Sequence, residues 1–256
     1  MQKPARNPDL LLLATLLAAL IASVPATRAQ SASFLISQHG KSVGTASYNI
    51  TASADGYDST ALVHVNMQGL NYAISEAARL SAARQLRHVE LSAIVNGSAV
   101  QVTAAPEDAA GAAPTLRLSI SANGHANSTH LAPHAASVFL PDFDPGALEM
   151  LLSLAALNNN RDLWAIIPKQ AGSVVPIQLA TYADQQGTLD GKPIVVHHLV
   201  ATIAGSETDL FSSPQNHLLQ AEFPAQGFAL VRKAFVLTPP VKPAAPPVEY
   251  SPPASQ

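Results

Sequence analysis

Apolar and polar residues alternate along much of this chain with a period of two, as expected of β-strands that bury one face. Leu116, Leu118 and Ile120, for example, alternate with polar residues. Between the alternating runs lie four dipeptides that suit the positive φ angles of tight hairpin turns. They are Asp55-Gly56, Asn96-Gly97, Asn123-Gly124 and Asp190-Gly191. The pattern therefore predicts a long antiparallel meander.

The alternation predicts strands over 32–38, 42–51, 57–67, 70–79, 84–95, 98–105, 114–122, 125–132, 162–168, 174–182, 186–190, 193–204, 217–223 and 228–237. So many strands do not fit easily into one flat sheet, and we expect the sheet to curl. The long stretch without a helix argues against parallel βαβ units. The predicted fold class is mainly β: a strongly curved antiparallel sheet, an open or half barrel, with one short helix packed against it.

One segment departs from the alternation and predicts that helix. Pro145 opens a run that ends at Leu157, and Asp144 can cap its first backbone N–H groups. The apolar stripe of this run consists of Ala147, Met150, Leu151, Leu154 and Leu157. So short a helix is unstable alone in water and must lie against the sheet. It either closes one end of the curved sheet or forms a lid over an apolar cavity.

The first 29 residues have the layout of a secretory signal peptide. Lys3 and Arg6 precede an apolar run over 10–24, and Thr27-Arg28-Ala29 presents small residues at the cleavage positions. The run is shorter than the roughly 20 residues that a membrane-spanning helix needs. We therefore expect a bacterial protein that is exported, cleaved and periplasmic or secreted, and that is not an integral membrane protein after cleavage.

The other end of the chain is rich in proline, with seven prolines between residues 238 and 256. Such a segment has too few apolar side chains to offset the entropy cost of ordering, so it should be extended. It is either a tolerated ragged end or a spacer or docking segment. The predicted organisation is a signal peptide over 1–29, a β half-barrel domain over 31–237 and a disordered tail over 238–256.

Charge and composition exclude several classes of function. The formal net charge of −3 and the acidic pI of about 6.3 provide no basic patch for nucleic acid. The chain has no cysteine, so it can form neither a disulfide nor a lipid anchor at a cysteine. With only 5% aromatic residues, its core must consist mainly of small aliphatic side chains.

The sequence contains no motif that points to catalysis. It has no GxSxG or HExxH motif, no phosphate-binding loop and no dinucleotide fingerprint. His125 and His130 lie close in sequence, but residues five apart on a strand face opposite sides, so they could converge on one metal ion only if a loop intervened. We expect no enzymatic activity, no metal and no cofactor.

The two ends of the predicted domain resemble exported bacterial proteins of unknown function. The segments that carry the resemblance are Gly40-Lys41-Ser42-Val43-Gly44, Tyr48-Asn49-Ile50, Glu222-Phe223-Pro224, Gly227-Phe228 and Val231-Arg232-Lys233-Ala234-Phe235. Those proteins look like the open half-barrels of periplasmic lipoprotein carriers. The resemblance implies a curved antiparallel sheet that wraps an apolar groove, with a short helix covering the groove.

Two functions are consistent with this picture. The first is a soluble periplasmic protein that binds or carries a lipid or another apolar ligand in the groove of the curved sheet. The expected ligand-binding residues are Met150, Leu151, Leu154, Trp164 and Ile166, because the strand over 162–168 is apolar on both faces. The alternative is a non-enzymatic envelope assembly or structural protein that holds an envelope protein through its sheet edge or Pro-rich tail.

Overall fold

The computed structural model describes residues 29–107, 114–169 and 172–239. The predicted signal peptide and most of the predicted Pro-rich tail lie outside these residues. The helix is α2 (Pro145–Leu157). The strands are β1 (Gln30–Gln38), β2 (Lys41–Ser53), β3 (Gly56–Met67), β4 (Leu70–Ser81), β5 (Leu86–Val95), β6 (Ser98–Glu107), β7 (Thr115–Ala122), β8 (His125–Leu131), β9 (Ser137–Phe139), β10 (Leu163–Ile167), β11 (Ser173–Thr181), β12 (Gln185–Leu189), β13 (Lys192–Ile203), β14 (Ser206–Ser212), β15 (Leu218–Phe223), β16 (Phe228–Arg232) and β17 (Phe235–Leu237).

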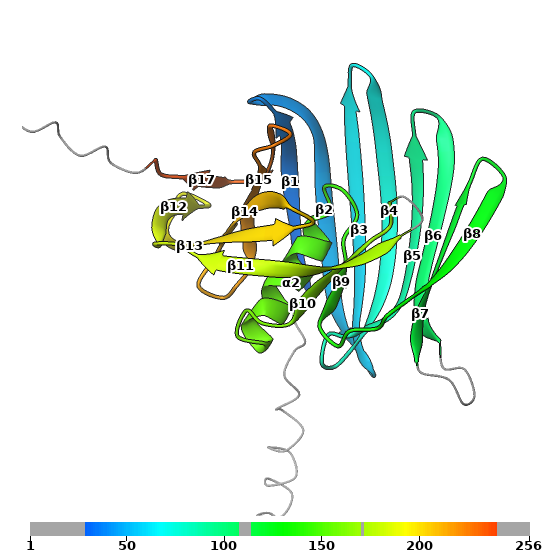
Figure 1. Ribbon diagram of the computed structural model, residues 1–256. Helices are drawn as coiled ribbons and strands as arrows, with labels where there is room; N and C mark the ends of the chain where they lie inside the picture. Colours follow the sequence, from blue (N-terminus) through cyan, green and yellow to red (C-terminus); the bar gives the residue numbers. More distant parts are fainter. Residues whose placement is uncertain (1–28, 108–113, 170–171, 240–256) are drawn as a thin grey trace, which may run out of the picture.

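The strands form one sheet that curls on itself (Figure 1). The main series runs in the spatial order β8-β7-β6-β5-β4-β3-β2-β1-β16-β15-β14-β13-β11-β10-β9. All of these neighbours are antiparallel except β9 and β10. The β1–β16 pair joins the long strands at the back of Figure 1 to the shorter strands that cross in front of them. Strand β12 pairs with β13 and β17, and this small layer has its own apolar cluster.

The curl is open, because the strands that end the main series do not pair with each other. Strand β8 pairs with β7, whereas β9 contacts β5. Gly172, just before β11, lies so close to Leu118 of β7 that a Cβ atom would collide with the leucine side chain. The predicted fold class is therefore confirmed: a large, mainly β, open antiparallel sheet with one helix among the described residues.

Helix α2 lies inside the curl, with contacts to β2 and β3 on one side and to β9 and β15 on the other. As predicted, Asp144 caps it, because its Oδ1 accepts hydrogen bonds from the backbone N–H groups of Gly146 (2.7 Å) and Ala147 (3.1 Å). The helix is buried all round from Pro145 to Leu152. Leu157 is an exception to the predicted apolar stripe, since the last turn leaves the curl and exposes 61% of this residue.

Sequence patterns missed two strands and merged two others. Strand β9 has only three residues, and β14 begins with the polar run Ser206-Glu207, so neither shows a full alternating pattern. The predicted strand 228–237 is divided into β16 and β17 by a turn in which Ala234 has a φ of 64°. Three predicted turn dipeptides, at 96–97, 123–124 and 190–191, do have positive φ at both positions.

Candidate functional site

A cavity of about 440 Å³ opens at the end of the curl that carries the β3–β4 and β15–β16 turns, and we call it the mouth cavity. Its apolar lining comes from β4, β10, β13, β15, α2 and the loop before α2. The apolar side chains are Leu70, Leu140, Pro141, Phe143, Leu148, Ile167, Ile203, Ala204 and Phe223. The polar lining includes Asp142, Asp144, Lys169, Ser206, Thr208 and Gln226. Both the volume and this mixture are typical of small-molecule sites.

Phe143 organises the aromatic wall of the mouth cavity. Its ring centroid lies 4.7 Å from that of Phe228, 6.0 Å from that of Phe223 and 6.2 Å from that of Tyr72. The backbone of Phe143 has a φ of 58°, which is strained for a bulky residue. Such strain is concentrated at binding and catalytic sites, so this loop is a good candidate for a functional segment.

The rim of the mouth cavity carries one ion pair, between Lys169 Nζ and Asp142 Oδ1 at 2.7 Å. Both side chains are partly exposed, so the pair contributes little to stability. Tyr72 lies beside this rim. Burial raises the pKa of Tyr72 well above its usual range, and the negative charges of Asp142 and Asp144 raise it further. Among the described residues, the charged side chains that line the mouth cavity are those of Asp142, Asp144 and Lys169.

Asp144, which lines the mouth cavity, forms a buried pair of carboxyl groups with Glu76, which lies behind it beside a smaller cavity of about 20 Å³. Asp144 Oδ2 and Glu76 Oε2 have no hydrogen-bond donor among the described residues. One proton shared between the two groups satisfies both oxygens. Burial is the main reason that the pKa of Glu76 is raised well above its usual value, and the charge of Asp144 and a hydrogen bond to it contribute as well. Burial also raises the pKa of Asp144, although the helix N–H groups oppose this effect.

The three predicted ligand-binding residues on α2 lie in the interior rather than in the mouth cavity. Leu151 and Leu154 are fully buried in the main apolar core. Met150 borders a cavity of only about 20 Å³ beside Glu76, which is room for a single water molecule. The helix therefore fills the interior of the curl instead of covering an empty groove.

The other two predicted residues, Trp164 and Ile166, lie on β10. Ile166 lines a second cavity of about 200 Å³, which it shares with Leu86, Leu116 and His134. Trp164 is half-buried and stacks on His134, with 3.6 Å between the ring centroids. The two residues thus share a neighbour, but neither lines the mouth cavity. The signal that sequence reasoning missed is Pro141-Asp142-Phe143-Asp144, in which an aromatic residue stands between two acids just before the helix.

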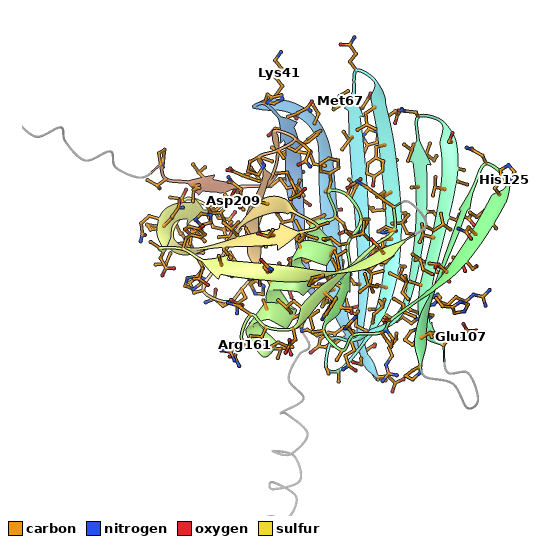
Figure 2. All side chains as sticks on the ribbon, viewed as in Figure 1. Lys41, Met67, Glu107, His125, Arg161 and Asp209 are labelled. Atoms are coloured by element: carbon orange, nitrogen blue, oxygen red, sulfur yellow. The ribbon has the colours of Figure 1, made fainter. Side chains whose placement is uncertain are left out.

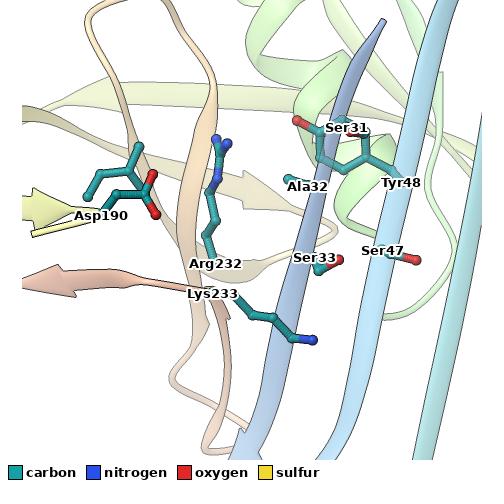
Figure 3. Close-up of a pocket in the computed structure, with 9 residues that line it drawn as sticks. Ser31, Ala32, Ser33, Ser47, Tyr48, Asp190, Arg232 and Lys233 are labelled. Atoms are coloured by element: carbon teal, nitrogen blue, oxygen red, sulfur yellow. The ribbon is translucent and has the colours of Figure 1, made fainter.

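A polar cleft of about 330 Å³ opens on another part of the molecule (Figure 3). It arises because β16 pairs with β1 only from Phe34 onwards, which leaves residues 30–33 of β1 without β16 beside them. Arg232, Lys233 and Asp190 line the cleft together with serine hydroxyls of β1 and β2. This lining suits a small polar or anionic molecule and does not suit a lipid chain.

The described residues contain neither a cluster of metal-ligating side chains nor a helix that could span a membrane. Within residues 29–107, 114–169 and 172–239, no three His, Asp or Glu side chains come close enough to hold a metal ion. His125 and Asp209, for example, lie at opposite sides of the molecule (Figure 2). In the same ranges, no helix is long and apolar enough to cross a membrane.

Fold and cavity together define a class of protein: a barrel-like antiparallel β domain that encloses a helix and opens onto an apolar cavity. No protein-family model and no curated protein matches the sequence. A similar solved structure is described as a beta-barrel-like protein of the domain of unknown function DUF1849 from Brucella abortus. The TM-score is 0.51 at 11% identity, and the match covers 82% of this chain and 98% of that chain. The likeness concerns the fold, and it supports the β-barrel-like part of the resemblance inferred from sequence.

Proposed function

We propose that this protein is an exported periplasmic protein that binds or carries a lipid or another apolar ligand, and that it does so without catalysis. The observation that carries the proposal is the mouth cavity, which combines about 440 Å³ of volume with a largely apolar wall and a few polar groups at its rim. The signal-like start of the chain is the basis for placing the protein in the periplasm.

The packing of α2 supports the mouth cavity as the binding site. Leu148, at the N-terminal end of the helix, borders the mouth cavity, whereas Leu151 and Leu154 are enclosed in the core. A ligand can therefore enter the mouth cavity without displacing the helix from the curl. A ligand among the interior residues would have to separate close-packed side chains, at the cost of their packing energy.

A non-catalytic role is consistent with the position of the Glu76–Asp144 pair. Carboxyl groups with raised pKa values are candidates for acid–base catalysis. The cavity next to Glu76, however, holds about 20 Å³, which is too small for an organic substrate. Asp144 does border the mouth cavity, but its carboxylate is engaged as the cap of α2. We therefore assign the pair a structural role.

The proposal is tested by filling the mouth cavity. Ser206 is an exposed residue at the start of β14 that lines the cavity, so Ser206→Trp adds bulk there without entering the core. Ser92 on β5 is also exposed, and Ser92→Trp is the matched control. We expect lysophosphatidylcholine to bind wild type and Ser92→Trp alike, and to bind Ser206→Trp about tenfold more weakly. The measurements are calorimetric titration and native mass spectrometry of the purified protein.

The free edge of the sheet favours a second candidate function, that of an envelope assembly or structural interaction protein. Among the described strands β8 pairs only with β7, and none of its residues is buried. Such an edge can accept a strand of another protein. The titration and the mass spectra also separate the two functions. A flat titration together with spectra free of bound lipid would contradict the carrier and leave the interaction protein.

A further inference from the structure

The negative charges of the groups that line the mouth cavity exceed their positive charges. Lys169 is already paired with Asp142 at 2.7 Å, so the charges of these two groups largely cancel. Asp144 lines the cavity and is fully buried, its Oδ2 has no hydrogen-bond partner, and no cation is paired with it among the described residues. The N–H groups of α2 compensate for only part of the negative charge of its carboxylate, because a helix end carries about half a unit of positive charge.

Buried charge of this kind acts strongly on a ligand. Solvent and salt screen it far less than they screen the exposed rim pair. An anionic head group placed near the mouth would therefore be repelled, unless it displaced Asp142 from Lys169 and left that carboxylate without its partner.

The aromatic side chains that line the mouth cavity also favour a positively charged ligand. Phe143 and Phe223 line the mouth cavity, with ring centroids 6.0 Å apart and planes nearly perpendicular at 83°. The face of an aromatic ring carries partial negative charge and attracts organic cations. Aromatic faces beside carboxylates are a recurring way to bind an alkylammonium group, because the rings tolerate its apolar surface while the carboxylates attract its charge.

We propose that the mouth cavity selects amphiphiles with a cationic head, of the alkylammonium class, and discriminates against anionic heads such as the carboxylate of a fatty acid. The selection rests on the proposed function, since it specifies the ligand class of the same cavity. The apolar tail meets the leucine and isoleucine side chains of the wall, and the ammonium group lies between the phenylalanine rings and the carboxylates.

Three probes with the same ten-carbon chain test this selection: decyltrimethylammonium, decanol and decanoate. Each is titrated at pH 7 into wild type and into Ser206→Trp, and only the binding that Ser206→Trp removes is assigned to the mouth cavity. We expect the ammonium probe to bind about tenfold more tightly than decanoate, with decanol between them.

Single-charge variants test the assigned groups. Asp142→Asn should reduce the ratio of ammonium to decanoate affinity severalfold, and Lys169→Gln should increase it by a similar factor. Asp58→Asn, which removes an exposed carboxylate from β3, is the control and should leave the ratio unchanged. Decanoate binding as tightly as the ammonium probe, or equal effects of Asp142→Asn and Asp58→Asn, would overturn the charge selection alone. If none of the three probes binds, the proposed function itself fails.

Discussion

At the scale of single residues, the buried carboxyl groups of this protein are accommodated in two different ways. Glu149 is fully buried on α2 and accepts hydrogen bonds from the backbone N–H of Leu218 (2.7 Å) and from the Gln30 side-chain amide. His217 Nδ1 lies 2.9 Å from the same carboxylate. Glu76 has no such set of donors, and its proton shared with Asp144 takes their place. Glu149 thus links three distant segments, whereas Glu76 makes stability depend on pH.

The sign of that dependence follows from the raised pKa of Glu76. A carboxyl group with a raised pKa favours the folded state below its ordinary value of about 4.5, and this contribution is lost as the pH rises through the folded-state pKa. Glu76→Gln keeps a donor toward Asp144 and removes the titration. We expect the variant to melt roughly 2–4 °C above wild type at pH 8, and at the same temperature as wild type at pH 4. Thermal melts between pH 4 and pH 8 measure this difference in melting temperature. A difference that is the same at every pH would contradict the shared proton.

At the scale of elements, close approach between neighbouring backbones depends on a few glycines, which have no side chain to keep the elements apart. Gly44 on β2 lies opposite Val65 of β3. A Cβ atom at this position would lie 2.1 Å from the backbone oxygen of His64, so the two strands would have to separate. Gly146 has a similar role on α2, where a Cβ atom would lie 3.1 Å from Tyr48 Cβ. The helix therefore depends on this close approach to β2 inside the curl.

Gly44→Ala tests the close approach of β2 and β3. We expect it to lower the free energy of unfolding by about 1–3 kcal/mol, because backbone atoms cannot rotate away as side chains can. Thr45→Ala, at the next position and on the exposed face, is the control and should change it by less than about 0.5 kcal/mol. Urea denaturation measures both. A loss in Gly44→Ala no larger than that in the control would show that the strands have room to move.

At the scale of the whole molecule, stability should decline from the centre of the curl to its free edge. Strand β3 pairs with β2 and β4 along its length and buries every second residue. Strand β8 pairs on one side and buries none of its residues. Local opening requires less free energy where few apolar contacts and few flanking strands hold the backbone.

Hydrogen exchange followed by mass spectrometry measures this gradient. We expect the amides of His125–Leu131 to exchange at least about a hundredfold faster than those of Gly56–Met67. Equal protection of the two segments would mean that β8 is covered in solution, by another copy of the chain or by another segment, and would weigh against a free edge. Repeating the exchange measurement at several protein concentrations shows whether another copy of the chain covers β8.

Local patterns were sufficient to predict most of the secondary structure. The alternation of residues such as Leu116 and Leu118 predicted the strands, and Asp144 with Pro145 predicted the start of α2. These predictions succeed because caps, turns and alternation depend on residues close in sequence. The curl of the sheet also followed, since many consecutive antiparallel strands cannot remain flat.

Only the tertiary structure decided where the cavity lies. Leu70, Phe143, Ile203 and Phe223 come together across more than half of the chain, through pairings such as β1 with β16 that no local pattern specifies. The same pairings enclosed the predicted site residues Leu151 and Leu154 in the core. An apolar helix shows which residues avoid water, but whether they meet a ligand or other side chains depends on what the rest of the chain brings to them.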